Sequence, residues 1–541
     1  MRFTSLIFVI FFLIVYVAFW SSRRTRLPLL FVASLAFYAA WSVVFALHFL
    51  AIIAVSHILI HHINVARRAS RSNRSRGYLW AVLAINFGNL FFFKYAFAVV
   101  ELLFDLGFFP SARFSSAGPD GAGDGARATW PGFALVLPLA ISFYTFQICA
   151  YAIDVWRGLP AITGDADVAG DGMETADEPG FLKFAVFILF FPQLVAGPIM
   201  RYHEFFGQLA RLERLEPRFE QITTGIFLLI QGFTKKILIA DNLAPATAAI
   251  LFHPEQYDWQ SCIAAMAGFT AQIYCDFSGY TDIARGLGKL LGLELPENFF
   301  GPYLSESFRA FWRNWHRTLT TWLRDYVYIP LGGNRVTVWR RHVNTMIVLI
   351  SIGLWHGAGY NFFVLGALNG LYLIGEETLS GFARARASRI TRGLDSPLIL
   401  KIGSLFTRCA GGVITLTYVT VAMVMMVTPD FSTTLALYGR AFGFDALASD
   451  YAQTAMTAMR HPAFEQLWGG YALALLLNVF QKMRDRWFRI TSDDAANTQW
   501  LFASRARRVA VLGGLWLLAF LFLIALGRFA PSSNDFFYFQ F

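Results

Sequence analysis

Apolar runs long enough to cross a lipid bilayer recur along the whole chain of 541 residues. A spanning helix needs about 17–25 mostly apolar residues, and shorter runs fit tilted or re-entrant segments. This pattern predicts an all-α polytopic membrane protein with about 11–13 transmembrane or re-entrant helices. The candidate runs are 5–20, 27–66 (long enough for a pair), 78–103, 132–155, 181–199, 221–240, 262–275, 344–375, 398–427, 467–481 and 509–527.

The composition excludes several other classes of protein. Hydrophobic residues make up 56% of the chain and charged residues 15%, whereas an ordinary soluble domain carries about 25% charged residues. The formal net charge is +10, but the bases lie in short clusters between apolar runs. Such clusters orient membrane spans and do not follow a phosphate backbone. We therefore exclude a soluble enzyme, a disordered chain and a nucleic-acid binder, and expect contact with membrane lipid.

The basic clusters also predict an orientation. Because Lys and Arg favour cytoplasmic loops, both the N-terminus and the C-terminal FFYFQF are expected outside. The connection 110–130 is rich in Gly, Ser and Ala and is expected to form a flexible external loop; the acidic connection 161–179 is assigned to neither side. The clusters are Arg23, Arg24 and Arg26; Arg67, Arg68, Arg71, Arg74 and Arg76; Arg201, Arg211, Arg214 and Arg218; and Arg505, Arg507 and Arg508.

His356 lies in the apolar run 344–375, where an ionisable side chain is costly and usually faces a cavity or a partner. Gly353, Gly357 and Gly359 remove side-chain bulk around it, so backbone or substrate can approach closely. Burial disfavours the charged imidazolium, and a neutral ring can accept a proton as a general base. The alternative is a histidine that bonds a neighbouring carbonyl and serves packing alone.

The segment 276–335 is dense in polar and aromatic residues although apolar runs flank it. Pro296 and Pro302 end the preceding helix, and Ser305 is a suitable N-cap for a new one. The spacing predicts one amphipathic helix at the interface or along a cavity. His316 on that face either takes part in proton transfer and orientation or anchors the helix. The residues that share the face are Arg309, Trp312, Arg313, His316 and Thr320.

Four further polar residues, Asp276, Ser278, Tyr280 and Asp282, follow the apolar run 262–275. They line a substrate passage or cap a helix, and capping is the simpler interpretation for Asp276 and Ser278. His57 and His61 have an i, i+4 spacing that can hold a metal, but no third ligand lies nearby, so we expect no metal site. The sequence contains no Walker A, GxSxG or HExxH motif, so ATP-driven and hydrolytic mechanisms lose support.

Five segments together resemble the membrane-bound O-acyltransferase (MBOAT) family, and within it the bacterial polysaccharide branch. They are FPQLVAGPIMR (191–201), QGFTKKILIAD (231–241), YCDFSGYTDIARGLG (274–288), ENFFGPYLSESFRAFWRNWHRTLTTWLRDYVYIPLGGNR (297–335) and GLWHGAGYNF (353–362). The resemblance implies helices around a central tunnel. It also implies N-terminal helices and an external loop at 1–130, a catalytic core at 131–375, and C-terminal helices with an external tail at 376–541.

The family moves an acyl group onto a hydroxyl, and its invariant histidine corresponds to His356 here. The second polar position of the family falls on His316, which would orient the acyl group or stabilise developing charge. One departure is Leu368-Asn369-Gly370, where similar proteins often carry a second Trp-His-Gly, so a role for that histidine is not expected here. The residues that the resemblance and the polar pattern assign to the tunnel or substrate are Trp312, Arg313, Trp315, Arg324, Asp325, Trp355, Asp276, Ser278, Tyr280 and Asn361.

The resemblance implies an inner-membrane O-acetyltransferase that modifies an exopolysaccharide such as alginate. No bound cofactor is expected; the acyl donor would be acetyl-CoA on the cytosolic side. The expected partners are a periplasmic acetyltransferase and a polysaccharide biosynthesis complex. Alternatives within the family are D-alanyl transfer toward teichoic acids and acetylation of peptidoglycan or cellulose. Outside the family, the alternatives are a transporter or channel that uses His356 as a proton relay and a scaffold for biosynthetic partners.

Overall fold

Over the residues that it describes, the computed structural model contains helices and two short antiparallel strands, β1 (Ala128–Trp130) and β2 (Phe133–Leu135). Several of the expectations concern residues outside the described ranges. They are those on most of the loops 110–130 and 161–179, on the run 509–527, on Arg505, Arg507 and Arg508, and on the C-terminal tail. The structure describes residues 3–96, 99, 103, 128–130, 133–135, 137–158, 179–390, 397–443 and 460–493.

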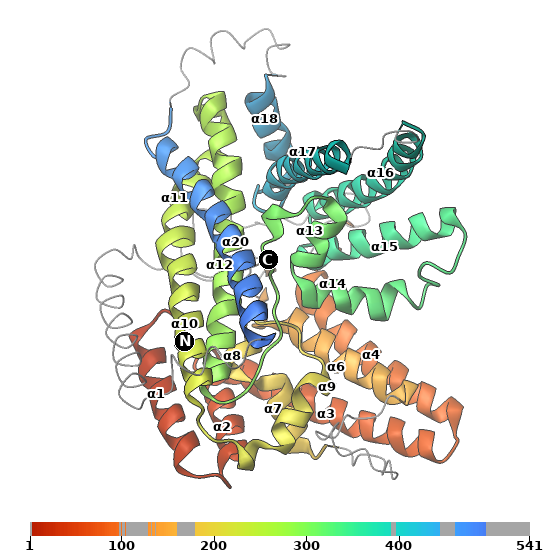
Figure 1. Ribbon diagram of the computed structural model, residues 1–541. Helices are drawn as coiled ribbons and strands as arrows, with labels where there is room; N and C mark the ends of the chain where they lie inside the picture. The colour runs from red at the N-terminus through yellow and green to blue at the C-terminus, as the bar shows by residue number, and fades with distance from the viewer. Residues whose placement is uncertain are drawn as a thin grey trace.

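Four N-terminal helices form two consecutive hairpins, drawn in red to orange in Figure 1. Ser5 and Ser42 cap the first and third of them, since their hydroxyls accept hydrogen bonds from the backbone N–H groups of Phe8 and Phe45. The four helices are α1 (Leu6–Ser21), α2 (Arg26–Ala39), α3 (Val43–Arg68) and α4 (Ser72–Lys94).

A bundle of long helices forms one side of the molecule, on the left in Figure 1. Two pairs of glycines let α10 and α12 approach closely. A Cβ atom at Gly286 would lie 2.8 Å from the carbonyl oxygen of Gly225, and one at Gly279 would lie 2.8 Å from that of Gly232. Small residues at helix crossings are typical of membrane bundles. The bundle comprises α10 (Phe219–Phe233), the π-helix η2 (Thr234–Ala240), α11 (Asp241–Phe252), α12 (Trp259–Leu290) and α20 (Phe464–Asp493).

The remaining helices complete the molecule beside this bundle. In Figure 1, α13 and α14 lie between the bundle and the hairpin of α15 and α16, and α17 and α18 lie above them. The elements are α6 (Ile141–Arg157), α7 (Phe181–Leu189), α8 (Phe191–Leu194), α9 (Tyr202–Ala210), η1 (Leu212–Arg214), η3 (Pro254–Gln256), η4 (Pro302–Leu304), α13 (Phe308–Asn314), α14 (Arg317–Leu323), the π-helix η5 (Arg324–Tyr328), α15 (Val338–His356), α16 (Tyr360–Ile390), α17 (Pro397–Met423), η6 (Val424–Met426) and α18 (Phe431–Phe442).

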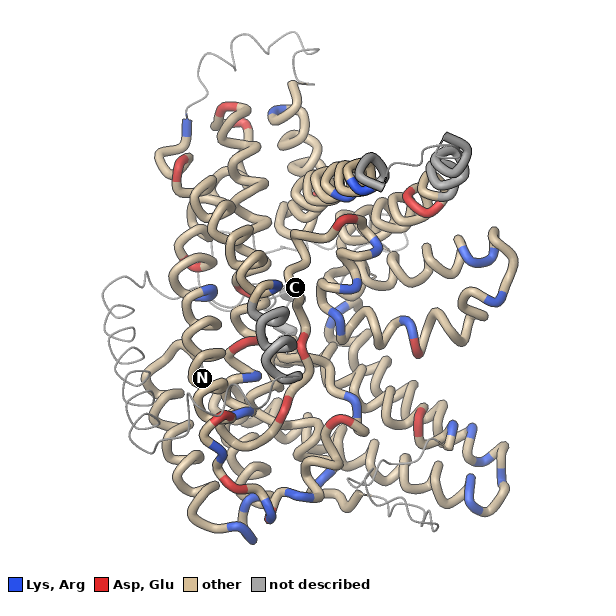
Figure 2. Tube along the Cα trace, viewed as in Figure 1, with Lys and Arg blue, Asp and Glu red and all other residues tan. Residues whose placement is uncertain are grey.

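Three helical segments of the described part are long and apolar enough to cross a membrane: Val43–Arg68, Phe219–Phe252 and Lys401–Met426. The helices Leu6–Ser21 and Arg26–Ala39 are apolar but shorter. Helices such as α12 carry buried polar residues that lower their mean hydropathy. Figure 2 shows Lys and Arg gathered where α1 meets α2 and where α3 meets α4, as the clusters in the sequence place them.

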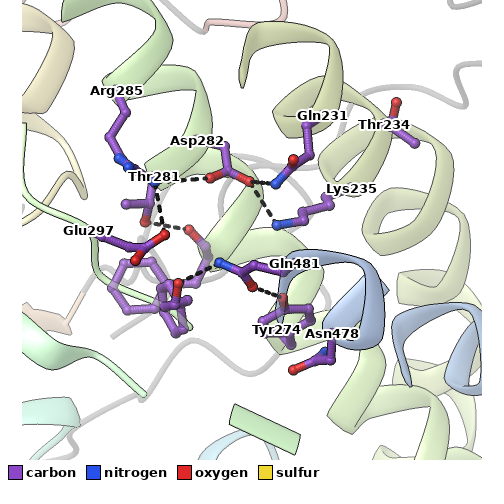
Figure 3. A network of polar contacts seen from close by, with 12 residues as sticks. Gln231, Thr234, Lys235, Tyr274, Thr281, Asp282, Arg285, Glu297, Asn478 and Gln481 are labelled. Atoms are coloured by element: carbon purple, nitrogen blue, oxygen red, sulfur yellow. Dashed lines mark hydrogen bonds and ion pairs between the residues drawn. The ribbon is translucent and has the colours of Figure 1, made fainter. Parts of the chain in front are cut away.

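Buried ion pairs join α12 to η2, and Figure 3 shows part of this network. The ammonium group of Lys235 lies 2.7 Å from a carboxylate oxygen of Asp282, which also accepts a 2.7 Å hydrogen bond from Gln231. Lys236 lies 2.7 Å from carboxylate oxygens of both Asp241 and Asp276. Charges at such depth are stabilised only when paired and hydrogen-bonded, so these contacts fix the register between the two helices.

Candidate active site

His356 is the last residue of α15 and is buried, with 6% of its surface exposed. The C-terminal end of α4 contacts this helix end. Lys94 Nζ donates a hydrogen bond to the carbonyl oxygen of Trp355. The hydroxyl of Tyr95 donates a 2.8 Å hydrogen bond to the carbonyl oxygen of Leu354. The last carbonyls of a helix have no partner within the helix. Lys94 and Tyr95 therefore stabilise the end of α15 and fix the place of His356.

Glycines bring α16 against α15 at the level of His356. A Cβ atom at Gly353 would overlap the carbonyl oxygen of Phe362 and lie 3.0 Å from the backbone nitrogen of Gly366, and one at Gly357 would overlap the ring of Phe362. At Gly359 the nearest atom would be 3.8 Å away, an ordinary contact. Gly353 and Gly357 thus allow the close approach of the chain that was expected around His356.

For the acyl transfer that the resemblance implies, with His356 as its candidate base, we expect Gly353→Ala to lower the rate by about 100-fold, because a displacement of about 1 Å at a reacting group can cost that much. The new methyl group would push α15 away from α16 and move His356. Gly375→Ala is the matched control, since a Cβ atom at Gly375 in α16 would have no atom within 4 Å. The measurement is the initial rate of acyl transfer at equal amounts of folded protein. Equal rates for the two variants would contradict this account of Gly353.

A small, partly open pocket lies beside His356, and its empty volume of about 400 Å³ includes open solvent. Its wall is mostly apolar and aromatic, and its polar groups include the imidazole of His356, the amide of Asn369 and the indole of Trp312. The indole N–H of Trp312 is buried and has no hydrogen-bond partner within the described ranges. The lining residues are Phe308, Phe311, Trp312, Trp315, Ile352, Gly353, His356, Leu365, Asn369, Val419, Ala422, Met423 and Met426.

The aromatic segment after η4 is broken at His316, so the prediction of one continuous helix with Ser305 as its N-cap is wrong. Ser307 caps α13, which ends at Asn314, and α14 begins at Arg317. His316 between them has a left-handed backbone conformation, with φ 43° and ψ 51°, which costs a side-chain-bearing residue about 1–3 kcal/mol. The break turns His316 into the protein core, where 1% of its surface is exposed.

The two candidate histidines contact the same indole ring, that of Trp355. The ring of Trp355 makes edge-on contacts with His316, at a centroid distance of 5.5 Å, and with His356, at 4.8 Å. His356 is among the residues that line the cavity, whereas His316 is not and packs against Phe277 and Phe299. The structure therefore brings together His316, Trp355 and His356, although the two histidines are 40 residues apart in the sequence.

The other residues expected in the site have different places. Trp312 and Trp315 line the cavity, whereas Arg313 and Arg324 are exposed. Asp325 accepts hydrogen bonds from Arg201 at 2.8 Å and from Arg324 at 2.7 Å. Asn361 is buried and donates a 3.1 Å hydrogen bond to the carbonyl oxygen of Thr428. Asp325 thus joins η5 to the residue before α9, Asn361 joins the start of α16 to the segment after η6, and neither is among the residues that line the cavity.

Asp276, Ser278 and Tyr280 all lie within α12, so the interpretation that Asp276 and Ser278 cap a helix is wrong. The helix begins at Trp259 after the cap residue Asp258 and continues to Leu290. Asp276 instead pairs with Lys236, and the ring of Tyr280 stacks on Phe3 at a centroid distance of 4.8 Å. The helix continues past the apolar run because η2 supplies cations for its polar face.

Sequence reasoning missed several residues around the site. Lys94 carried a usable signal, because a lysine inside the apolar run 78–103 needs a partner. Asn298, which contacts His316, carried only a weak signal, because an asparagine shortly before a helix is common as a cap. The cavity residues Val419, Ala422 and Met423 of α17 are ordinary apolar residues of a long run, so no sequence pattern distinguishes them.

Comparison with known proteins decides the family. The model of the membrane-bound O-acyltransferase family matches residues 128–421, more than half of the chain. The chain belongs to the MBOAT family. It is therefore an O-acyltransferase, and the polytopic membrane fold expected from the sequence is the fold of this family.

Relatives within the MBOAT family share much of the chain. The probable alginate O-acetylase AlgI of Azotobacter vinelandii is 33% identical over 405 residues, which cover 74% of each protein. The peptidoglycan O-acetyltransferase of Helicobacter pylori is 32% identical over 355 residues, 64% of this chain and 63% of that protein. The teichoic acid D-alanyltransferase of Bacillus subtilis is 30% identical over 195 residues, 34% of this chain and 48% of that protein.

Proposed function

We propose that this MBOAT protein takes acetyl groups from acetyl-CoA on the cytosolic side and moves them across the inner membrane for O-acetylation of an exported, alginate-like polysaccharide. The likeness to alginate O-acetylases over 74% of the chain supports the polymer class. The observation that carries the chemistry is the place of His356. Its imidazole is buried in the wall of an apolar cavity and held at the end of α15 by α4.

In this proposal His356 acts as the general base. It removes the proton from the accepting hydroxyl, whose oxygen then attacks the acyl carbonyl carbon. The ester C–O bond forms, the thioester C–S bond breaks, and the proton passes from His356 to the leaving thiolate. His316, which is buried against Trp355, orients the reacting groups. The apolar wall excludes water, which would otherwise hydrolyse the donor.

The lining of the cavity supports an uncharged acyl group. None of the described residues that line it carries a carboxylate. A D-alanyl group brings an ammonium ion, and burying that ion without a counter-charge is costly. An acetyl group has no charge and fits a wall of Phe, Trp, Val and Met side chains. This contrast favours acetyl transfer over the D-alanyl transfer named for the Bacillus relative.

The cellular setting is part of the same proposal. The protein would be a multi-pass protein of the bacterial inner membrane, within a polysaccharide biosynthesis complex. A periplasmic acetyltransferase would receive the acyl group and complete the modification. The apolar helices Val43–Arg68, Phe219–Phe252 and Lys401–Met426 support the membrane location.

The test is complementation of cells that lack this chain. We expect wild-type protein to restore base-labile acetate on the exported polysaccharide, and His356→Ala at the same membrane level to restore none. Acetate that returns in the peptidoglycan fraction instead would assign the acceptor to peptidoglycan. Full restoration by His356→Ala would overturn the general-base mechanism and favour a channel or scaffold.

A further inference from the structure

Asn298 makes a dense set of contacts at the break between α13 and α14. It lies in the segment that connects α12 to η4 and is fully buried. Its backbone carbonyl accepts a 3.0 Å hydrogen bond from the N–H of Arg317. Its side-chain oxygen lies 3.2 Å from Nδ1 of His316, 3.2 Å from the backbone nitrogen of Thr318 and 3.0 Å from the hydroxyl of Thr318. The side chain of Asn298 thus contacts both His316 and the start of α14.

These contacts determine which way the amide of Asn298 faces. The backbone N–H of Thr318 can only donate, so the atom it meets must be the amide oxygen and not the NH₂ group. The hydroxyl of Thr318 accepts a 3.0 Å hydrogen bond from the N–H of Ile199 and is free to donate its own proton to the same oxygen. The oxygen of Asn298 therefore faces His316.

The orientation of the amide determines the tautomer of His316. An amide oxygen has no proton to give, so Nδ1 of His316 must carry the hydrogen in the 3.2 Å contact. The ring is packed against Phe277, Phe299 and Trp355, an apolar surrounding that disfavours the imidazolium ion. A neutral ring with its proton on Nδ1 has a lone pair on Nε2. That atom is buried and has no partner among the described residues.

We propose that Asn298 is a positioning residue that holds His316 as a hydrogen-bond acceptor at Nε2. The inference rests on the proposed function and changes the role of His316 within it. An Nε2 atom with a lone pair cannot donate a hydrogen bond to the oxyanion of a tetrahedral intermediate. It accepts one, and the group in the reaction that offers a proton is the hydroxyl of the acceptor. His316 thus orients the attacking hydroxyl while His356 removes its proton.

Three variants separate this role from a structural one. Asn298→Leu keeps the size of the side chain but removes the acceptor, Asn298→Asp keeps the acceptor, and Thr318→Val removes the hydroxyl links while leaving the contact with His316. Steady-state acetyl transfer from acetyl-CoA is measured in membrane vesicles at equal folded protein, judged by gel filtration in detergent. Asn298→Ala replaces Asn298→Leu if the latter does not accumulate.

We expect Asn298→Leu to lower kcat by about 100-fold, since a histidine in the wrong tautomer loses orders of magnitude in rate. The KM for acetyl-CoA should stay within about twofold, because Asn298 is not among the residues that line the cavity. Asn298→Asp should stay within about tenfold of wild type, and Thr318→Val within about threefold.

The proposal is overturned if Asn298→Leu retains its kcat, if folded Asn298→Asp is as inactive as Asn298→Leu, or if Thr318→Val loses as much rate as Asn298→Leu. The last result would show that the helix start, not the tautomer, controls activity. Failure of the proposed function has a different signature, because His356→Ala and His316→Ala would then keep wild-type rates.

Discussion

Replacing His356 by alanine is expected to lower the rate of acyl transfer by about 1,000-fold, because a positioned general base contributes about 10²–10⁴-fold. The imidazole lies in the cavity wall at the end of α15, and the described residues that line the cavity include no Asp, Glu, Lys or second histidine. No other lining group can therefore take the proton in its place. The measurement is the initial rate of acetyl transfer in membrane vesicles that contain equal amounts of protein.

The control is His62→Ala. The ring of His62 stacks on Tyr78 at a centroid distance of 5.2 Å, between α3 and α4 and away from the cavity lining. This variant should keep at least half of the wild-type rate. A His356→Ala protein that keeps more than about a tenth of the wild-type rate would show that another group acts as the base.

Lys235→Met is expected to lower the free energy of unfolding by about 3 kcal/mol, the lower end of the cost of breaking a buried ion pair. The lysine has 2% and its partner Asp282 has 6% of the side-chain surface exposed. Removing the cation leaves the carboxylate in the core with Gln231 and with Arg285, whose guanidinium is 3.9 Å away. The measurement is unfolding in mixed micelles as a function of the SDS fraction.

Two further variants test whether the unpaired charge of Asp282 causes this loss of stability. The double variant Lys235→Met, Asp282→Leu removes both charges and should recover most of the lost stability, since well-packed apolar pairs replace buried ion pairs at little cost. Glu216→Gln breaks the exposed pair with Arg23, in which 62% and 69% of the side chains are exposed, and should change the stability by less than about 1 kcal/mol. A double variant as unstable as Lys235→Met would contradict the account.

The candidate base His356 stands out in the sequence because it breaks a local rule. His356 is an ionisable residue within an apolar run, and the glycines around it fit only a close approach of chains. The break at His316 was not predictable in the same way. Trp312, Arg313, His316 and Thr320 follow a helical spacing, but four hydrogen bonds to Asn298 stabilise a left-handed residue within it.

Contacts between distant segments explain the other differences. The polar residues after Cys275 look like helix caps until Lys235 and Lys236, about 40 residues earlier, are placed beside them. One wall of the cavity comes from α17 and η6, whose Val, Ala and Met side chains carry no signal in a single sequence. Periodicity describes one helix at a time, so it cannot show which helices share a cavity.

The most direct test of the account uses inverted inner-membrane vesicles from the host, with labelled acetyl-CoA added outside, at the face that was cytosolic. We predict that vesicles with the wild-type chain accumulate base-labile label on polysaccharide in their lumen, and that vesicles with His356→Ala accumulate none above those that lack the chain. Equal lumenal label with wild type and His356→Ala, or label confined to the outer face, would contradict acyl transfer across the membrane through this site.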